Sequence, residues 1–183
     1  MRSIPGMVVM SPADDVEARA MVKAAYEYEG PVYMRFSRLA TPVFNDEASY
    51  HFEIGKGITL RDGKDLTIVA NGLCVPAALE AAEKLAADGI DARVINIHTI
   101  KPLDEELIIK AAKETGKIVT VEEHNVLGGL GGAVCECVCA KCPVPVKRLG
   151  VQDVFGESGT AAALLAKHGL DADGIYRQVK EFA

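Results

Sequence analysis

The sequence predicts an α/β fold with a mainly parallel sheet and helices on both faces, a three-layer α/β/α arrangement. Strand-like and helix-like segments alternate from residue 66 onward, as in folds built from β-α-β units. The strand-like segments are continuous apolar runs, as expected of strands that helices cover on both sides. The expected strands are LTIVANG, ARVINI, KIVTVEE and VPVKRLGV, and the expected helices are VPAALEAAEKLAAD, LDEELIIKAAKET, LGGAVCECVCAK, SGTAAALLAKHG and a last one, DADGIYRQVKEF.

The first 45 residues form a separate and incomplete block. MVVMS predicts a strand, VEARAMVKAAYEYE an amphipathic helix that Gly30 ends, and VYMRF a second strand. A single β-α-β unit buries too little apolar surface to offset the cost of ordering its backbone, roughly 1 to 2 kcal/mol per residue. We therefore expect this block to rest on the second block, on another copy of the chain, or on a partner that supplies the missing strands.

A linker, TPVFNDEASYHF, separates this block from the rest, because hydrophobic periodicity lapses there and turn-forming residues gather. We place the domain boundary near residue 45, which gives an incomplete piece over 1–45 and a full domain over 46–183. The segment EIGKGITLRDGK that follows the linker predicts a short hairpin.

The composition is that of a protein that acts on small molecules or on other proteins. The formal net charge is −6 and the basic residues are scattered, so neither nucleic acid nor an anionic membrane is an expected partner. No apolar run approaches the roughly 18 to 20 residues that span a bilayer. The segment MRSIPGMVVM lacks the long apolar region of an export signal, so we expect a cytoplasmic location.

The stretch VEEHNVLGGLGGAV places a glycine-rich turn between a strand and a helix, at the edge of the sheet where open α/β folds bind ligands. Its spacing does not match G-x-G-x-x-G, because the position after Gly129 and Gly131 that should be glycine is Val134. We therefore favour a tight turn, in which glycines allow positive φ and close helix packing, over a nucleotide site. An anion bound at the start of the helix stays an open alternative.

Four of the five cysteines lie in CECVCAKC. Cys135, Cys139 and Cys142 are spaced to share one helix face, which would suit a metal ion. Closed zinc sites usually combine C-x-x-C pairs from different turns, and no second half is present. We expect reduced cysteines that fill the core rather than a metal site.

Two histidines follow strands at the same edge of the predicted sheet. His98 in NIHTIKP and His124 in EEHN could each contact a ligand or transfer a proton. A hydrogen-bonded histidine without such a role is the interpretation that we favour. His51 and His168 have no supporting neighbours in the sequence.

Two arginines lie near the end of the second strand of the first block, Arg35 within it and Arg38 just beyond. A guanidinium there suits bidentate phosphate binding, and a surface ion pair is the equal alternative. No nucleophile with its base, and no acid and base pair of carboxylates, can be assigned. The residues alone indicate a ligand-binding edge without a visible catalytic residue.

Five long motifs carry a resemblance to a known family. They are RSIPGMVVMSPADDVEA, EIGKGITLRDGKDLTIVANG, INIHTIKPLDEELI, VTVEEHNVLGGLGGAV and VKRLGVQDVFGESG. Over nearly its whole length the chain resembles transketolase, particularly the C-terminal section of the split bacterial form. It is also similar to 1-deoxyxylulose-5-phosphate synthase and to the beta subunits of 2-oxo acid dehydrogenases, which share the architecture.

The resemblance implies that residues 1–45 are the tail of a thiamine-diphosphate pyrimidine-binding domain and that 46–183 are the transketolase C-terminal domain. In the family, the glutamate that protonates the cofactor and the main substrate loop lie upstream of RSIPGM. This chain alone is therefore expected to be inactive and to bind neither thiamine diphosphate nor magnesium. Its implied partners are the N-terminal transketolase section or the missing upstream domains, a second copy through the C-terminal domain, and sugar phosphates.

One functional residue carries over from the family by position. Arg38, in FSRLATP, corresponds to the arginine that holds the sugar phosphate, whereas Arg35 has no such counterpart. The family gives the GGLGG turn a structural, dimer-forming role and gives the cysteines no catalytic part. A non-catalytic α/β binding or assembly module is the function of a different class that we keep as an alternative.

Overall fold

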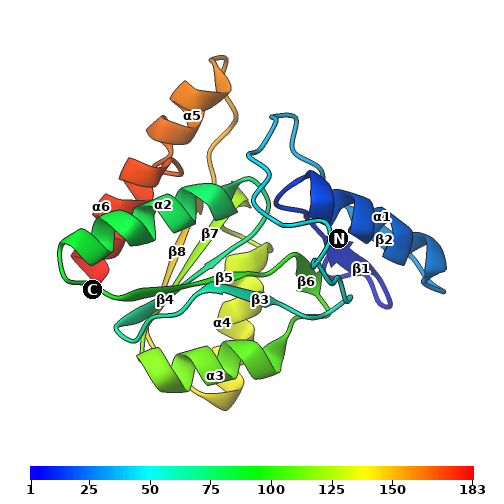
Figure 1. Cartoon of the computed structure of the whole chain (residues 1–183), viewed down its shortest axis with the longest axis horizontal. Coiled ribbons are helices and arrows are strands. Elements are labelled where there is room, and N and C mark those ends of the chain that lie inside the picture. Colours follow the sequence, from blue (N-terminus) through cyan, green and yellow to red (C-terminus); the bar gives the residue numbers. More distant parts are fainter.

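The computed structural model describes residues 1–183 and shows a three-layer domain with a smaller block docked at one side (Figure 1). The central sheet has the strand order β3-β5-β4-β7-β8. Four of its strands are parallel, and β3 pairs antiparallel with β5 at one edge. The predicted α/β fold is confirmed. Its strands are β3 (Ile58–Arg61), β4 (Leu66–Ala70), β5 (Ala92–Asn96), β7 (Ile118–Asn125) and β8 (Val146–Val151).

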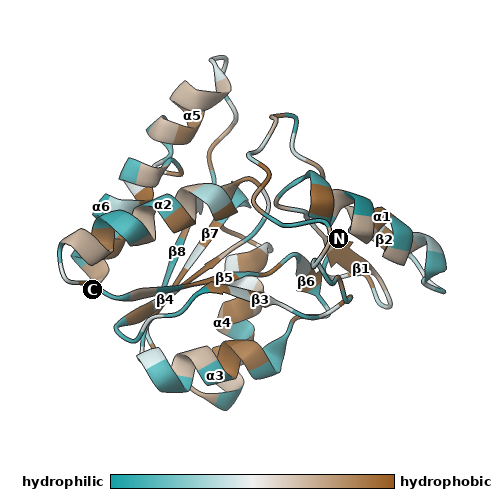
Figure 2. Ribbon diagram, viewed as in Figure 1, coloured by the Kyte–Doolittle hydropathy of each residue, from teal (hydrophilic) through white to brown (hydrophobic).

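Helices cover both faces of this sheet. On one face lie α2 (Cys74–Ala87) and α6 (Ala172–Phe182), and on the other lie α3 (Glu105–Thr115) and α4 (Leu130–Lys141) (Figure 1). Brown, apolar stretches of β4 and β5 lie between these layers, whereas the helices that cover them carry both hydrophilic and hydrophobic residues (Figure 2). Accordingly, every residue of β4 is buried.

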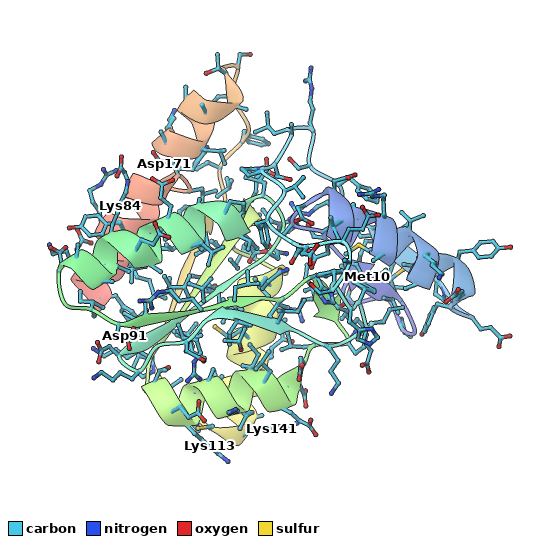
Figure 3. All side chains as sticks on the ribbon, in the orientation of Figure 1. Met10, Lys84, Asp91, Lys113, Lys141 and Asp171 are labelled. Atoms are coloured by element: carbon cyan, nitrogen blue, oxygen red, sulfur yellow. The ribbon has the colours of Figure 1, made fainter.

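The two helix layers each close a hydrophobic core against the sheet. A cluster of 18 buried residues joins α2 and α6 to one face, and a cluster of 11 joins α3 and α4 to the other. Charged residues such as Lys84 on α2 and Lys113 on α3 lie on opposite outer sides (Figure 3). A short helix, α5 (Ala161–Lys167), has no buried residue and projects beyond the core. None of the helices is long and apolar enough to cross a membrane.

A strand of the second block completes the small sheet of the first block. It contains β1 (Val8–Met10), α1 (Asp15–Glu27) and β2 (Val32–Met34), with β1 and β2 parallel. A further strand, β6 (Thr99–Lys101), pairs antiparallel with β1 and completes the order β2-β1-β6. The expectation that the first block rests on the second is therefore confirmed. The sequence does not predict β6, because three residues are too few to show a periodic pattern.

The prediction of a hairpin in EIGKGITLRDGK is wrong, because this segment contains only one strand. β3 is a single strand that pairs with β5 and not with its neighbour in sequence, β4. The apolar strand β5 would lie at the exposed edge of the sheet if β3 and β4 paired directly. Inserted between them, β5 gains hydrogen-bond partners on both sides, and three of its last four residues are buried with none exposed.

The small sheet is packed between α1 and α4. Val8 and Met10 face Met21 of α1 on one side. On the other side Val9 packs with Ile100 of β6 and with Ala133, at the start of α4. This second face joins the first block to the helix that follows the glycine-rich turn.

Candidate functional site

A buried carboxylate lies where the first block, the linker and the large sheet meet. Glu17, in the first turn of α1, is completely buried. Its Oε1 accepts hydrogen bonds from the Tyr50 hydroxyl at 2.5 Å and the Asn96 amide at 2.8 Å. Its Oε2 accepts one from the Ala13 N–H at 2.6 Å. Burial raises the pKa of Glu17 to about 7, because these hydrogen bonds offset only part of the cost of removing a carboxylate from water.

Asp14 joins the linker to the start of α1. Its Oδ1 accepts the Glu17 N–H at 2.9 Å and caps the helix. Its Oδ2 accepts the N–H groups of Phe44 at 3.1 Å and Asn45 at 2.9 Å. Burial works against ionisation of Asp14, and the hydrogen bonds overcome it and lower the pKa of the carboxyl. The spacing of Asp14 and Glu17 is that of a capping box, a signal that could have identified both residues from the sequence.

The glycine-rich turn binds a carboxylate side chain of the same chain. Glu122 of β7 is buried, and its two carboxylate oxygens accept the N–H groups of Leu130 and Gly131, each at 2.8 Å. These unpaired N–H groups at the start of a helix attract negative charge. A Cβ atom at Gly129 would lie 1.9 Å from the Glu122 carboxylate, so only glycine allows this approach. The predicted close-packed turn is confirmed, and Glu122 takes the anion position that the sequence left open.

His98 is a core residue. It is 1% exposed, its ring stacks on Phe52 with the centroids 4.4 Å apart, and its Nδ1 lies 2.9 Å from the Thr99 hydroxyl oxygen. Burial lowers the pKa of His98 to about 4, so the ring is neutral near pH 7. The favoured interpretation of a hydrogen-bonded histidine is confirmed at this position.

His124 and Arg35 line the same small cavity between the two blocks. The cavity has a volume of about 140 Å³ and also contacts Tyr33, Glu122 and Arg2. The Arg35 guanidinium donates to the carbonyl oxygen of Glu123, which ties β2 to β7. His51 and His168 do not reach this cavity.

Arg38 lies elsewhere, in a groove of about 830 Å³ between the segment after β2 and α5. Its side chain is exposed and forms no ion pair within the chain. Ser158 and His168 line the same groove. The structure thus separates Arg35 and Arg38 into two different sites, and the phosphate-binding role of Arg38 stays a prediction.

The cysteines of α4 lie in different environments. Cys137 is buried in the core against the sheet, as predicted. Cys139 is exposed, so the prediction of a core-filling residue is wrong there, because the helix turns this position to solvent. Cys135 and Cys142 are partly buried. All five cysteines of the chain, including buried Cys74, are free thiols.

Comparisons with known proteins agree with this architecture. Residues 55–175 match the family model for the transketolase C-terminal domain, and residues 1–43 match the model for the transketolase pyrimidine binding domain. The chain belongs to the transketolase family. It corresponds to the C-terminal section of split transketolases, as its resemblance implied, while the exact boundary near residue 45 stays a prediction.

Relatives in the transketolase family match almost the whole chain. A 6-deoxy-6-sulfo-D-fructose transketolase subunit of Clostridium sp. (strain MSTE9) is 46% identical over 99% of the chain and 56% of its own length. A putative transketolase C-terminal section of Methanocaldococcus jannaschii is 46% identical over 99% of the chain and 57% of its own length. The chain therefore spans a little more than half the length of these transketolase relatives.

A solved structure agrees with the same assignment. A split gene transketolase, described as an inactive beta4 tetramer, superimposes with a TM-score of 0.95 at 49% sequence identity. The match covers 99% of the chain and 59% of that structure. The identity is high enough for the fold and the family membership to be the same.

The residues of this chain alone do not fit the cofactor of the transketolase family. A diphosphate group needs unpaired donors and a metal ion, but Glu122 fills the start of α4. No group of three or more histidine, cysteine, aspartate or glutamate side chains could hold a metal ion. The expectation that the chain alone binds no cofactor stays a prediction that binding measurements can test.

Proposed function

We propose that this chain is the C-terminal part of a transketolase and becomes catalytic only together with an N-terminal section. The complete enzyme transfers a two-carbon ketol unit between sugar phosphates in the cytoplasm. Thiamine diphosphate, with magnesium, supplies the carbanion chemistry when it is bound. This chain supplies the end of the pyrimidine-binding domain, the substrate phosphate contact at Arg38 and the C-terminal domain through which two copies pair.

The observation that carries this proposal is the incomplete small sheet. Its strand β2 has a neighbour on one side only, so the other edge presents unpaired backbone groups to solvent. Residues 1–43 are also the stretch that matches the pyrimidine binding domain. An upstream section that adds strands to β2 would complete that domain and would bring its remaining residues to this chain.

The names of the relatives support a transketolase reaction without fixing the sugar. One is a 6-deoxy-6-sulfo-D-fructose transketolase subunit, and another belongs to an apulose-4-phosphate transketolase of Phocaeicola vulgatus and is 43% identical over 100% of the chain. The solved split transketolase formed by beta chains is described as inactive. By analogy we expect this chain to be inactive alone.

A second candidate activity keeps the same cofactor. A 1-deoxy-D-xylulose-5-phosphate synthase of Heliobacterium modesticaldum is 44% identical over 100% of the chain. The two candidate enzymes form different products, so substrate assays on the completed enzyme separate them. A non-catalytic binding module remains the outcome if no donor reacts in the completed enzyme.

The deciding experiment is an assay of ketol transfer with thiamine diphosphate and magnesium. We expect no turnover by the chain alone and turnover after its cognate N-terminal section is added, with a phosphorylated ketose as donor. Formation of 1-deoxy-D-xylulose 5-phosphate without ketol transfer would assign the chain to the synthase. No turnover in either assay, in a complex shown to assemble, would contradict the enzyme proposal.

Arg38→Ala tests the proposed phosphate contact in the completed enzyme. We expect KM for phosphorylated sugars to rise roughly 10- to 100-fold, because a charge-assisted contact to phosphate contributes on the order of 1.5 to 3 kcal/mol. KM for an unphosphorylated ketol donor should change less than about twofold. Arg177→Ala, an exposed arginine of α6, is the matched control. Equal losses on both donor types would remove Arg38 from the phosphate site.

A further inference from the structure

We propose that the cavity between the two blocks binds inorganic hydrogen phosphate, at a site separate from Arg38. The cavity of about 140 Å³ lies between the α4-facing side of the small sheet and the glycine-rich turn. A protein cavity of roughly 150 Å³ holds a molecule the size of benzene, so an anion of five heavy atoms fits. The carboxyl ends of β2 and β7 both open toward it, the end of parallel strands where α/β folds bind ligands.

Three polar side chains that line the cavity have hydrogen-bonding groups left over. Arg35 uses one guanidinium nitrogen for the Glu123 carbonyl, and its other N–H groups have no partner in the chain. The Tyr33 hydroxyl has no hydrogen-bond partner in the chain. The Nε2 atom of His124 is likewise unpaired, because only Nδ1 of that ring makes a hydrogen bond. The His124 side chain is 43% exposed, so the cavity opens to solvent and a small anion can enter it. Unpaired donors and an unpaired acceptor around one cavity favour a ligand that pairs with all of them.

The charges that line the cavity favour an anion. Arg35 carries a positive charge without an ion-pair partner, and Arg2 adds a second beside it. The Arg2 guanidinium is held by Glu136 at 2.8 and 3.0 Å and by the Gly128 carbonyl at 3.0 Å. Glu122 also lines the cavity and its Oε2 lies 3.8 Å from Nδ1 of His124, but both of its carboxylate oxygens accept N–H groups of α4. Arg35 is therefore the cation free to pair with a ligand.

His124 makes the site selective for an anion that keeps a proton. Its Nδ1 lies 2.6 Å from the carbonyl oxygen of Asn125, which can only accept, so Nδ1 carries the hydrogen. In the neutral ring Nε2 is then an acceptor. Hydrogen phosphate can donate its P–OH proton to Nε2 while its other oxygens accept from Arg35 and Tyr33. Sulfate and the dianion of a phosphate monoester have no proton to donate.

A ligand held in this way links the two blocks. Arg35 and Tyr33 belong to the first block, whereas His124 belongs to β7 of the large sheet. The bound anion stabilises their contact by mass action, since it binds the docked arrangement only. Phosphate should therefore slow amide exchange in β1 and β2 while exchange in β4 stays unchanged.

The test is calorimetric titration of the 183-residue chain with inorganic phosphate, sulfate and methyl phosphate at pH 8 and constant ionic strength. We expect phosphate to bind roughly fivefold or more tightly than the other two anions, the effect of about one hydrogen bond. His124→Ala should bring the three affinities within about twofold. Arg35→Met should weaken phosphate binding at least about tenfold, and Tyr33→Phe, which keeps the ring packing, should weaken it about threefold.

Arg177→Met, at an exposed arginine of α6, is the matched control, because Arg177 does not line the cavity. We expect this variant to bind phosphate as the wild type does. Binding that is lost in Arg38→Met and kept in Arg35→Met would place the anion in the other groove and overturn the proposal. Unchanged binding in both Arg35→Met and Tyr33→Phe, no preference for phosphate over sulfate, or no measurable binding by the wild type would overturn it as well.

Discussion

Glu17 and Glu122 are both buried glutamates, yet their surroundings differ. Glu122 lies against two N–H groups at the start of a helix, where the helix dipole favours its charge. Glu17 has three neutral donors around it and no nearby cation, and its pKa is raised to about 7. A proton on Glu17 therefore belongs to the stable form of the junction at mildly acidic pH.

The raised pKa predicts that stability falls as pH rises. Between the ordinary value of 4.5 and about 7, Glu17 is ionised in the unfolded chain and protonated in the folded one. The contribution is complete below pH 4.5 and is lost by about pH 7, a decrease of roughly 3 kcal/mol.

Glu17→Gln tests this dependence. Urea unfolding at pH 5 and pH 8 should show a smaller difference in free energy of unfolding for the variant than for the wild type. Glu83→Gln, an exposed residue of α2 without an ion pair, is the control and should behave like the wild type. An identical pH difference in Glu17→Gln and wild type would show that Glu17 does not titrate as described.

The close packing at Gly129 predicts that even a methyl side chain at this position destabilises the protein. Gly129→Ala should destabilise the fold by about 2 kcal/mol or more, because its Cβ would collide with the buried Glu122 carboxylate. Gly132→Ala, three residues further in α4, meets only the flexible end of Arg2 at 3.1 Å and should be neutral or slightly stabilising. Thermal unfolding compares the two, and equal effects would contradict the role given to Glu122.

At the scale of elements, the first block docks through β6, one small apolar contact and a few hydrogen bonds, such as those of Glu17 with Asn96 and of Arg35 with Glu123. β6 is a three-residue strand of the second block that pairs with β1, and Val9 packs against Ile100 and Ala133 behind it. This contact is small compared with the two cores of the large sheet. The junction should therefore open before the large sheet unfolds.

Val9→Asp should open that junction selectively. A carboxylate at this buried position replaces the apolar contact with Ile100 and Ala133 and loses its hydration, so amide exchange in β1 and β2 should become faster by an order of magnitude or more. Exchange in β4 should stay slow. Val22→Asp, at a half-exposed position of α1, is the control. Faster exchange throughout the chain would mean that the two blocks unfold as one unit.

For the whole molecule, the two blocks differ in what they can do alone. The large domain has its own two cores of 18 and 11 buried residues, whereas the first block has only a cluster of 3 under α1. Small blocks without a substantial core do not repay the entropy of ordering. This asymmetry agrees with a chain whose first block is the end of another domain.

The asymmetry predicts the behaviour of fragments. Residues 46–183 should unfold cooperatively in urea, at a lower midpoint than the full chain because Ile100 and Ala133 become exposed. A peptide of residues 1–45 should show no stable structure by circular dichroism. Cooperative unfolding of the 1–45 peptide would contradict the proposal that the first block is an incomplete piece of a domain.

The sequence by itself determined the fold class, because the alternation of strands and helices and their apolar runs are local patterns. It also predicted that the block of residues 1–45 is incomplete, since the small number of strands in this block is visible in the sequence. The capping pair Asp14 and Glu17 was visible in principle from its spacing. The resemblance to transketolase came from long motifs and agrees with both family models.

Only the tertiary structure decided which strands and side chains meet. The place of β3 beside β5, the pairing of β6 with β1 and the contact of Asn96 with Glu17, 79 residues apart, join segments far apart in the chain. The separation of Arg35 from Arg38 likewise depends on where β2 docks. Such contacts are set by competition among all the surfaces that the chain can bury, and no local pattern records the outcome of that competition.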